Sequence, residues 1–208
     1  MSSQQGPEGM NFVAIDFEMA NARRASICQI GLIKVINGVP GHQFTGLVTP
    51  PPGHTMFTPQ NTRIHGITSW DVKNAGGDFI PAPGWPEMLE RLWKYTHEGT
   101  LPLVAHNAPV ERSGIEQATA ACGLEIPFYE YLCTLNLSRR WLPDSPNHKL
   151  DTITDHLNLG KFGHHDAGED ARVTALLLLE IARRNNVTSL GELWPDYQWQ
   201  KNPVAAGR

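Results

Sequence analysis

Two carboxylates at the end of an apolar segment constrain this chain more than any other feature. Residues 11–15 read Asn-Phe-Val-Ala-Ile, which is typical of a buried strand, and Asp16 and Glu18 follow two residues apart. Because a β-strand sends residues i and i+2 to the same face, both carboxylates would project together from the edge of a sheet. Like charges that close repel each other unless a cation lies between them. Mg²⁺ and Mn²⁺ favour such oxygen ligands, so the pattern indicates a metal-dependent enzyme.

The size of the chain predicts one domain of ordinary dimensions. It has 208 residues, of which 40% are hydrophobic, and this leaves no room for a second full domain. We divide it into a flexible N-terminal tail (1–10), a catalytic domain (11–194) and a C-terminal tail (195–208). The formal net charge of -4 gives no large basic field that would attract nucleic acid, so any such attraction would need a local basic patch.

Cysteine usage and hydropathy indicate the cellular compartment. Cys28, Cys122 and Cys133 are odd in number and far apart, so we expect neither a disulfide framework nor a thiolate zinc site. A reducing, cytoplasmic setting follows from this usage. No apolar stretch reaches membrane-spanning length and residues 1–9 are polar, so we expect no membrane association and no signal peptide.

The order of apolar runs and turn residues predicts an α/β fold. Three strands are expected first, and two further strands then alternate with helices. The expected strands are 11–17, 26–36, 42–49, 101–105 and 131–134. The expected helices begin with a short one capped at 68–71 and continue with 85–97, 109–122, 150–157 and 167–184. This order predicts a mixed sheet with helices on its faces.

A second group of polar residues lies near the start of the last long helix. Asp166 and Glu169 have the spacing of a helix N-terminus, which would start the helix at residue 167. His165 would then lie just outside the helix and Asp170 in its first turns, where the two side chains can converge. We therefore expect a general base beside a metal ligand, and we interpret His164 as a solvated loop residue.

A third group follows the strand predicted at 101–105. Asn107 suits a helix N-cap, Pro109 suits the first turn, and Glu111 would lie early in the helix with its carboxylate near the end of the strand. A third acidic side chain therefore has a route to the same edge of the sheet.

Several motifs in order resemble one known family. They are Ile-Asp-Phe-Glu at 15–18 with Gln-Ile-Gly at 29–31, Ile-His-Gly-Ile-Thr at 64–68, Ala-His-Asn-Ala at 105–108, Asn-His-Lys-Leu at 147–150, and the spacing of His165 to Asp170. Together they resemble the histidine-containing (DEDDh) branch of the DEDD exonucleases, which includes the epsilon proofreading subunit of bacterial DNA polymerase III. The resemblance implies a ribonuclease-H-like fold, with a three-strand antiparallel opening followed by parallel strands.

The resemblance also implies the chemistry. It implies 3′-5′ hydrolysis of phosphodiester bonds to 5′-mononucleotides, with two Mg²⁺ or Mn²⁺ ions bound by four carboxylates and a histidine as general base. The corresponding metal ligands are Asp16, Glu18, Glu111 and Asp170, and the corresponding base is His165. Glu111 departs from the family, which normally has Asp there, and we expect altered metal affinity rather than inactivity.

Substrate contacts are implied by the same motifs. Phe17 and Met19 would border the terminal nucleotide, His65 would belong to the nucleoside pocket, and Asn107 would lie near the substrate. The expected partners are 3′ ends of nucleic acid, DNA and in the alternative RNA, which only contacts to the 2′-hydroxyl would separate. A catalytically weak binding module associated with a polymerase is a further alternative, and a polymerase partner or a homodimer stays open.

Overall fold

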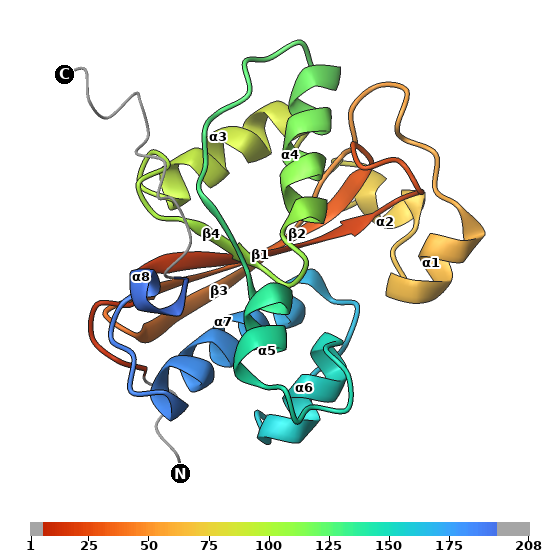
Figure 1. The fold of residues 1–208 in the computed structure, drawn as a ribbon. Coiled ribbons are helices and arrows are strands. Elements are labelled where there is room, and N and C mark those ends of the chain that lie inside the picture. The colour runs from red at the N-terminus through yellow and green to blue at the C-terminus, as the bar shows by residue number, and fades with distance from the viewer. Residues whose placement is uncertain (1–5, 195–208) are drawn as a thin grey trace, which may run out of the picture.

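The structure is a computed structural model that describes residues 6–194. One five-stranded sheet forms its centre, with the strand order β3-β2-β1-β4-β5 (Figure 1). The strands are β1 (Phe12–Met19), β2 (Ile27–Ile36), β3 (Val39–Leu47), β4 (Leu103–Ala105) and β5 (Tyr131–Cys133). Strands β1, β2 and β3 pair antiparallel, whereas β4 pairs parallel with both β1 and β5. The predicted mixed sheet with an antiparallel opening is therefore confirmed.

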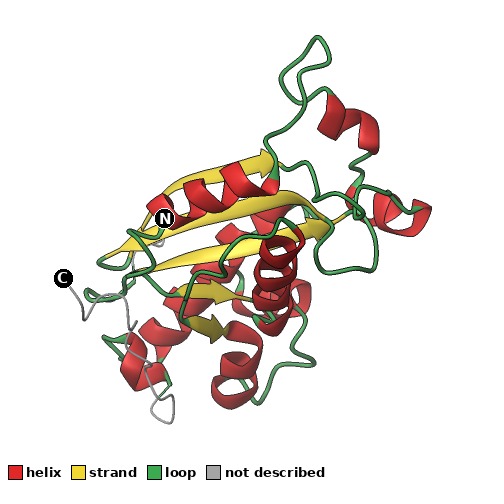
Figure 2. Ribbon diagram, turned by 90° about the horizontal axis from the view of Figure 1, so that it is seen from above, coloured by secondary structure: helices red, strands yellow, loops and turns green. Residues whose placement is uncertain are grey.

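Helices cover both faces of this sheet (Figures 1 and 2). They are α1 (Pro59–His65), α2 (Ser69–Lys73), α3 (Trp85–Tyr95), α4 (Pro109–Ala121), α5 (Thr134–Trp141), α6 (Leu150–Leu157), α7 (Ala167–Arg184) and α8 (Leu190–Leu193). The side chains of α5, α6, α7 and α8 share a core with one face, and those of α3 and α4 share a core with the other. Helices α1 and α2 form a separate lobe beyond one end of the sheet (Figure 1).

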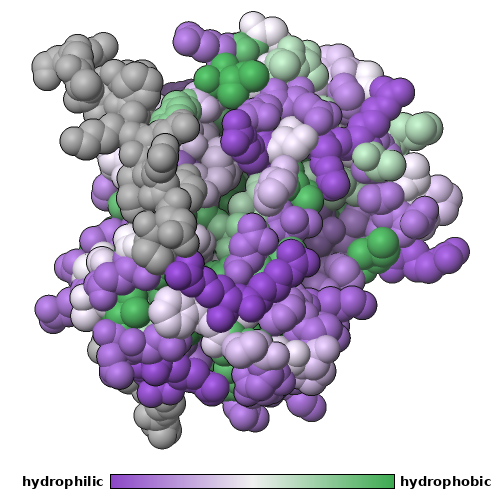
Figure 3. All heavy atoms as spheres, in the orientation of Figure 1, coloured by the Kyte–Doolittle hydropathy of each residue, from purple (hydrophilic) through white to green (hydrophobic). Residues whose placement is uncertain are grey.

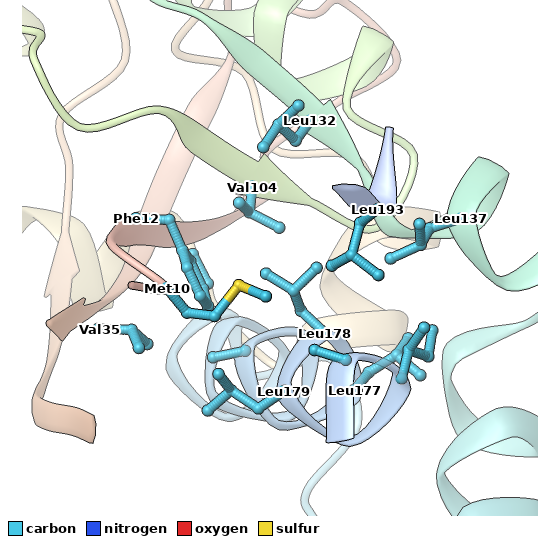
Figure 4. Packing of buried hydrophobic residues seen from close by; sticks show 14 of the residues in the cluster. Met10, Phe12, Val35, Val104, Leu132, Leu137, Leu177, Leu178, Leu179 and Leu193 are labelled. Atoms are coloured by element: carbon cyan, nitrogen blue, oxygen red, sulfur yellow. The ribbon is translucent and has the colours of Figure 1, made fainter. Parts of the chain in front are cut away.

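Successive side chains of β1 point alternately into the hydrophobic cores on the two faces of the sheet. Phe12 and Ala14 point into the core around α7, whereas Val13 and Ile15 point into the core around α3 and α4. Figure 4 shows residues of β1, β4 and β5 directed toward the leucines of α7. Because alternate residues share a face, Asp16 and Glu18 continue the side of the sheet that α7 covers. The strand geometry predicted for the two carboxylates is thus the observed one.

A glycine allows α7 to begin directly against the sheet. Gly31 on β2 pairs with Asp16 on β1, and a Cβ atom on Gly31 would lie 1.9 Å from the carbonyl oxygen of Ala167. The Ala167 N–H donates to Oε1 of Gln29 at 3.0 Å and fixes the same contact. A glycine inside a strand commonly marks such a close backbone approach. It sets the first turn of α7 beside Asp16.

The N-terminal tail predicted for residues 1–10 is shorter than expected. Met10 is fully buried in the core around α7, and its carbonyl oxygen accepts from the N–H of Gly38 at 3.0 Å. The N–H of Gly6 donates to the carbonyl oxygen of Gly38 at 2.8 Å. The prediction was wrong for Met10 because an isolated apolar residue before the strand carries no periodic signal. Residues 1–5 and the predicted C-terminal tail lie outside the described residues. Every helix between residues 6 and 194 is too short or too polar to cross a membrane.

Candidate active site

Three carboxylates from two distant parts of the sequence meet at the end of β1. Asp16 and Glu18 project from the strand, and Asp170 comes from the first turns of α7. One oxygen from each of the three lies within 4.8 Å of the others. Glu18 and Asp170 are only 8% and 4% exposed. The cluster predicted from the sequence is therefore assembled, and it is largely shielded from solvent.

Glu111 brings a fourth carboxylate from the opposite face of the sheet. It lies in the first turn of α4 and is 3% exposed, and its charge raises the pKa of Asp16. Among the described residues its Oε2 atom has no hydrogen-bond partner. A buried carboxylate oxygen without a partner costs free energy, unless a ligand that the protein itself does not supply satisfies it.

The cluster strongly favours protonation when no cation is near. Burial holds the pKa of Asp16 well above its ordinary value, and the charges of Glu111, Asp170, Glu18 and Asp166 raise it further. Burial, followed by the charges of Asp170 and Asp166, raises the pKa of Glu18 to about 8. Burial likewise raises the pKa of Glu111 to about 8. Desolvation and repulsion therefore act together on Asp16 and Glu18, whereas desolvation alone raises the pKa of Glu111.

These residues fit hard divalent cations. Asp16, Glu18, Asp170 and Glu111 offer carboxylate oxygens, which suit Mg²⁺ or Mn²⁺ and not a thiolate-preferring metal. A cation would offset the repulsion among Asp16, Glu18 and Asp170, and the Glu111 oxygen without a partner is available for a second one.

The histidines before α7 are arranged differently from the prediction. His164, interpreted as a solvated loop residue, places its ring Nδ1 2.9 Å from Oδ1 of Asp170. His165 instead donates its backbone N–H to Oδ2 of Asp170 at 3.1 Å, and its ring stacks on His164 with centroids 4.0 Å apart. The backbone of His165 is left-handed, with φ 69°. This turn brings both rings to Asp170. His164 is an exposed loop residue, as interpreted, but the contact of its ring with Asp170 was not expected.

Both histidine rings stay close to the carboxylates. One ring nitrogen from each of His164 and His165 lies within 4.8 Å of the other and of an oxygen of Asp170. Burial lowers the pKa of His165 below its ordinary value, and the neighbouring His164 lowers it further. A neutral imidazole at pH 7 can accept a proton. The predicted cap is also observed, since Asp166 Oδ1 accepts from the N–H of Glu169 at 3.0 Å.

The lobe of α1 contacts the end of β1 through two side chains. His65 Nδ1 accepts from the N–H of Ile67 at 3.0 Å, so Nε2 carries the proton and donates to the carbonyl oxygen of Met19 at 3.2 Å. Asn61 Nδ2 donates to the same oxygen at 2.9 Å. Met19 and His65 are thereby held together beside Glu18. The structure thus groups two of the four predicted substrate residues.

The other two substrate residues are placed less favourably. The side chain of Phe17 is buried in the core around α3, where its ring packs edge to face on Trp85 at 6.1 Å. Its ring is buried and does not form the expected apolar wall, because strand alternation turns it away from Asp16 and Glu18. A contact of its backbone amide with the terminal nucleotide stays a prediction. Asn107 is exposed with φ 86°, and Ala108, not Asn107, is the N-cap of α4.

His106, beside Asn107, has a structural role. Its Nε2 lies 2.9 Å from the carbonyl oxygen of His148 and its Nδ1 lies 3.0 Å from Thr134 Oγ1. Burial lowers the pKa of His106 to about 4, so the ring is neutral. It joins the end of β4 to the segment before α6.

Sequence reasoning missed three residues that organise the site. They are Gly31, Asn61 and the ring of His164. A glycine in the middle of an apolar strand was an available signal for Gly31. The contacts of Asn61 and His164 depend on turns whose geometry only the folded chain reveals.

Comparisons with known proteins find similar exonucleases. Residues 13–178 match the family described as Exonuclease (RNase_T). The chain is 30% identical over 196 residues to DNA polymerase III PolC-type of Caldanaerobacter subterraneus subsp. tengcongensis, covering 92% of this chain and 13% of that protein. It is 27% identical over 176 residues to the 3′-5′ exonuclease DinG of Bacillus subtilis, covering 83% of this chain and 18% of that protein.

Solved structures share the fold. Exonuclease X in complex with 5′ overhanging duplex DNA matches with a TM-score of 0.65 and 25% identity, covering 86% of this chain and 95% of that one. A 3′-exonuclease that recognises a histone mRNA stem-loop matches with a TM-score of 0.67 and 15% identity, covering 86% of this chain and 83% of that one. The second similarity concerns the fold alone.

Proposed function

Because this chain belongs to the exonuclease family RNase_T, we propose that it is a metal-dependent 3′-5′ exonuclease that removes 5′-mononucleotides from the 3′ ends of DNA, chiefly single-stranded DNA. One observation carries the proposal. Asp16, Glu18 and Asp170 place oxygens within 4.8 Å of one another, and the buried Glu111 beside them has an oxygen without a partner among the described residues. A fold without hydrolytic function has no need to gather four acidic groups at such a cost.

Each carboxylate has a proposed role. Asp16 lies at the centre of the cluster and would bridge two cations, Glu18 and Asp170 would complete the site on the side of the attacking water, and Glu111 would serve the side of the leaving group. Bound Mg²⁺ or Mn²⁺ would supply charge that stabilises the attacking and leaving oxygens.

His165 is the proposed general base. Its ring is exposed toward solvent and lies next to Asp170, and its lowered pKa keeps a ring nitrogen free to accept the proton of the attacking water near pH 7. His164 has its Nδ1 engaged with Asp170 and would orient that carboxylate. Met19 and His65 would support the terminal nucleoside, and Asn107 would lie at the edge of the same site.

A cleavage assay tests the proposal. Oligonucleotides labelled at the 5′ end, as single-stranded DNA, blunt duplex DNA and single-stranded RNA, are incubated with the protein and Mg²⁺ or Mn²⁺. We expect stepwise shortening from the 3′ end, fastest on single-stranded DNA, and none with Asp16→Asn or with EDTA. Absence of shortening on every substrate would overturn the proposal. Faster shortening of RNA would overturn the assignment to DNA.

A further inference from the structure

The lobe of α1 and α2 exposes an aromatic pair that the site described above does not use. Trp70 on α2 is 62% exposed and Phe79 in the following loop is 74% exposed. Their rings pack edge to face with centroids 5.6 Å apart. In Figure 3 the lobe, at the right of the molecule, shows hydrophobic side chains between hydrophilic ones. Neither ring contributes to the small core under the lobe, which contains Ile67 and Val72.

Phe79 adopts a backbone conformation that costs free energy. Its φ is 63° and that of Asp78 is 46°, whereas bulky residues rarely occupy the left-handed region. The surrounding loop is fixed by backbone bonds, since Gly76 N–H donates to the carbonyl oxygen of Ile80 at 3.0 Å and Ala82 N–H donates to that of Val72 at 2.7 Å. Strain of this kind persists mainly where it serves a function.

The aromatic pair lies in the same lobe as His65, which belongs to the proposed nucleoside pocket. His65 and Asn61 on α1 both bond to Met19 beside the carboxylates. Trp70 follows His65 by five residues, so their Cα atoms are at most about 18 Å apart. Stacked nucleotides rise about 3.4 Å each, so this distance corresponds to roughly five nucleotides or fewer. A strand whose 3′ end occupies the site can therefore reach the pair.

Charges on the lobe suit the backbone of such a strand. Arg63 and Lys73 lie in the last turns of α1 and α2 and are both exposed. The carboxylate of Asp71 is taken by the cap of α2, where it accepts from the N–H of Thr68 at 2.7 Å. Exposed aromatic rings with nearby cations bind unpaired bases with little sequence preference.

We propose that Trp70 and Phe79 form a stacking platform for unpaired bases a few nucleotides upstream of the 3′ terminal nucleotide. This inference rests on the proposed function, because it needs a single strand whose 3′ end lies at the carboxylates. The platform binds substrate and has no part in the chemical step. Its contribution therefore depends on substrate length.

The test compares substrates with and without upstream bases. Rates are measured with thymidine 5′-monophosphate p-nitrophenyl ester and with single-stranded DNA of two to twelve nucleotides, for wild type, Trp70→Ala/Phe79→Ala, and Trp70→Phe. Val39→Ala is the control, because Val39 is also exposed (45%) but starts β3, outside this lobe. Melting curves check that the variants are folded.

We expect the double Ala variant to raise KM on the twelve-nucleotide substrate by about 5- to 150-fold, the range that corresponds to loss of one stacked base. The p-nitrophenyl ester should be cleaved at the wild-type rate, and Trp70→Phe and Val39→Ala should behave as wild type on every substrate. Equal KM values for wild type and double variant at all lengths would overturn the platform. Failure of the wild type to cleave any DNA would instead overturn the proposed function.

Discussion

Replacing Gly31 by Ala tests whether the close approach of α7 to β2 builds the catalytic site. The added Cβ would lie 1.9 Å from the carbonyl oxygen of Ala167, whereas Cβ atoms essentially never come within 3.0 Å of such an atom. The difference requires that strand and helix separate by at least 1.1 Å, because the atoms that the Cβ would meet in Ala167 and Gly168 all belong to the backbone. Asp170, three residues after Ala167, would move with the helix away from Asp16.

The expected loss follows from that displacement. Metal ligands tolerate errors of about 0.2 Å and catalytic groups lose about 10²-fold in rate per ångström, so kcat should fall at least about 10²-fold at saturating Mg²⁺. Overpacking costs about 1–3 kcal/mol, which corresponds to a fall of about 2–12 °C in melting temperature. Shortening of labelled DNA and thermal unfolding measure the two effects.

Gly163→Ala is the matched control for this variant. Gly163 lies in the segment before α7, has no positive φ, and has open space for at least 4 Å around the point where an added Cβ would lie. Gly168→Ala should be milder than Gly31→Ala, because the atoms it meets belong to the side chains of Thr45 and Gln43, which can rotate. Wild-type kcat in a folded Gly31→Ala protein would refute the reasoning, as would an equal loss in Gly163→Ala.

Three further predictions concern the side chains of the site. Without metal, the free energy of unfolding should fall as pH rises from about 5 to 8, because Glu18 and Glu111 have pKa values raised to about 8 and bind more protons in the folded than in the unfolded protein. Asp16→Asn should abolish cleavage yet raise the melting temperature of the metal-free protein at pH 8. A melting temperature below that of the wild type would contradict the repulsion between Asp16 and the other carboxylates. Glu111→Gln should lose most exonuclease activity, whereas Glu111→Asp should keep activity at a shifted Mg²⁺ requirement. A Mg²⁺ titration of the Gln variant that matches the wild type would show that Glu111 binds no metal. His165→Ala should slow the chemical step about 10²- to 10⁴-fold, whereas His164→Ala should mainly raise the Mg²⁺ requirement. If single-turnover rates fell more in His164→Ala than in His165→Ala, His164 would be the general base.

The sequence predicted the parts of the fold that follow a local period. Residues 12–18 alternate between the two faces of the sheet as a strand requires, and this alternation places Asp16 and Glu18 on one face. The apolar residues of α7 likewise predict a long buried helix. Helix α1 was missed although Thr58 caps its start and Gly66 ends it, because its seven residues bury no side chain and show no apolar periodicity. Family membership and the ribonuclease-H-like fold, expected from the ordered motifs, are confirmed.

The histidine arrangement shows where local reasoning ends. Spacing alone put His165 near Asp170, which is correct for the backbone, but the left-handed turn at His165 also brings the ring of His164 onto the carboxylate. Phe17 shows the opposite case, since strand alternation would have been enough to show that its side chain faces away from Asp16, although we expected Phe17 to border the terminal nucleotide.

The placement of both cores on the first three strands has a consequence for synthesis of the chain. The segment 12–47 is made first, but one of its faces is covered by α3 and α4 and the other by α7, which is complete only at residue 184. At about 5–20 residues per second, the face that awaits α7 stays open for roughly 7 to 27 s after β3 emerges. For the first part of that interval, roughly 3 to 12 s, β1 also lacks its parallel neighbour β4, so an apolar meander with a free edge is presented to the solvent. The nascent chain is therefore most vulnerable to misassociation before the helix that brings Asp170 has been translated.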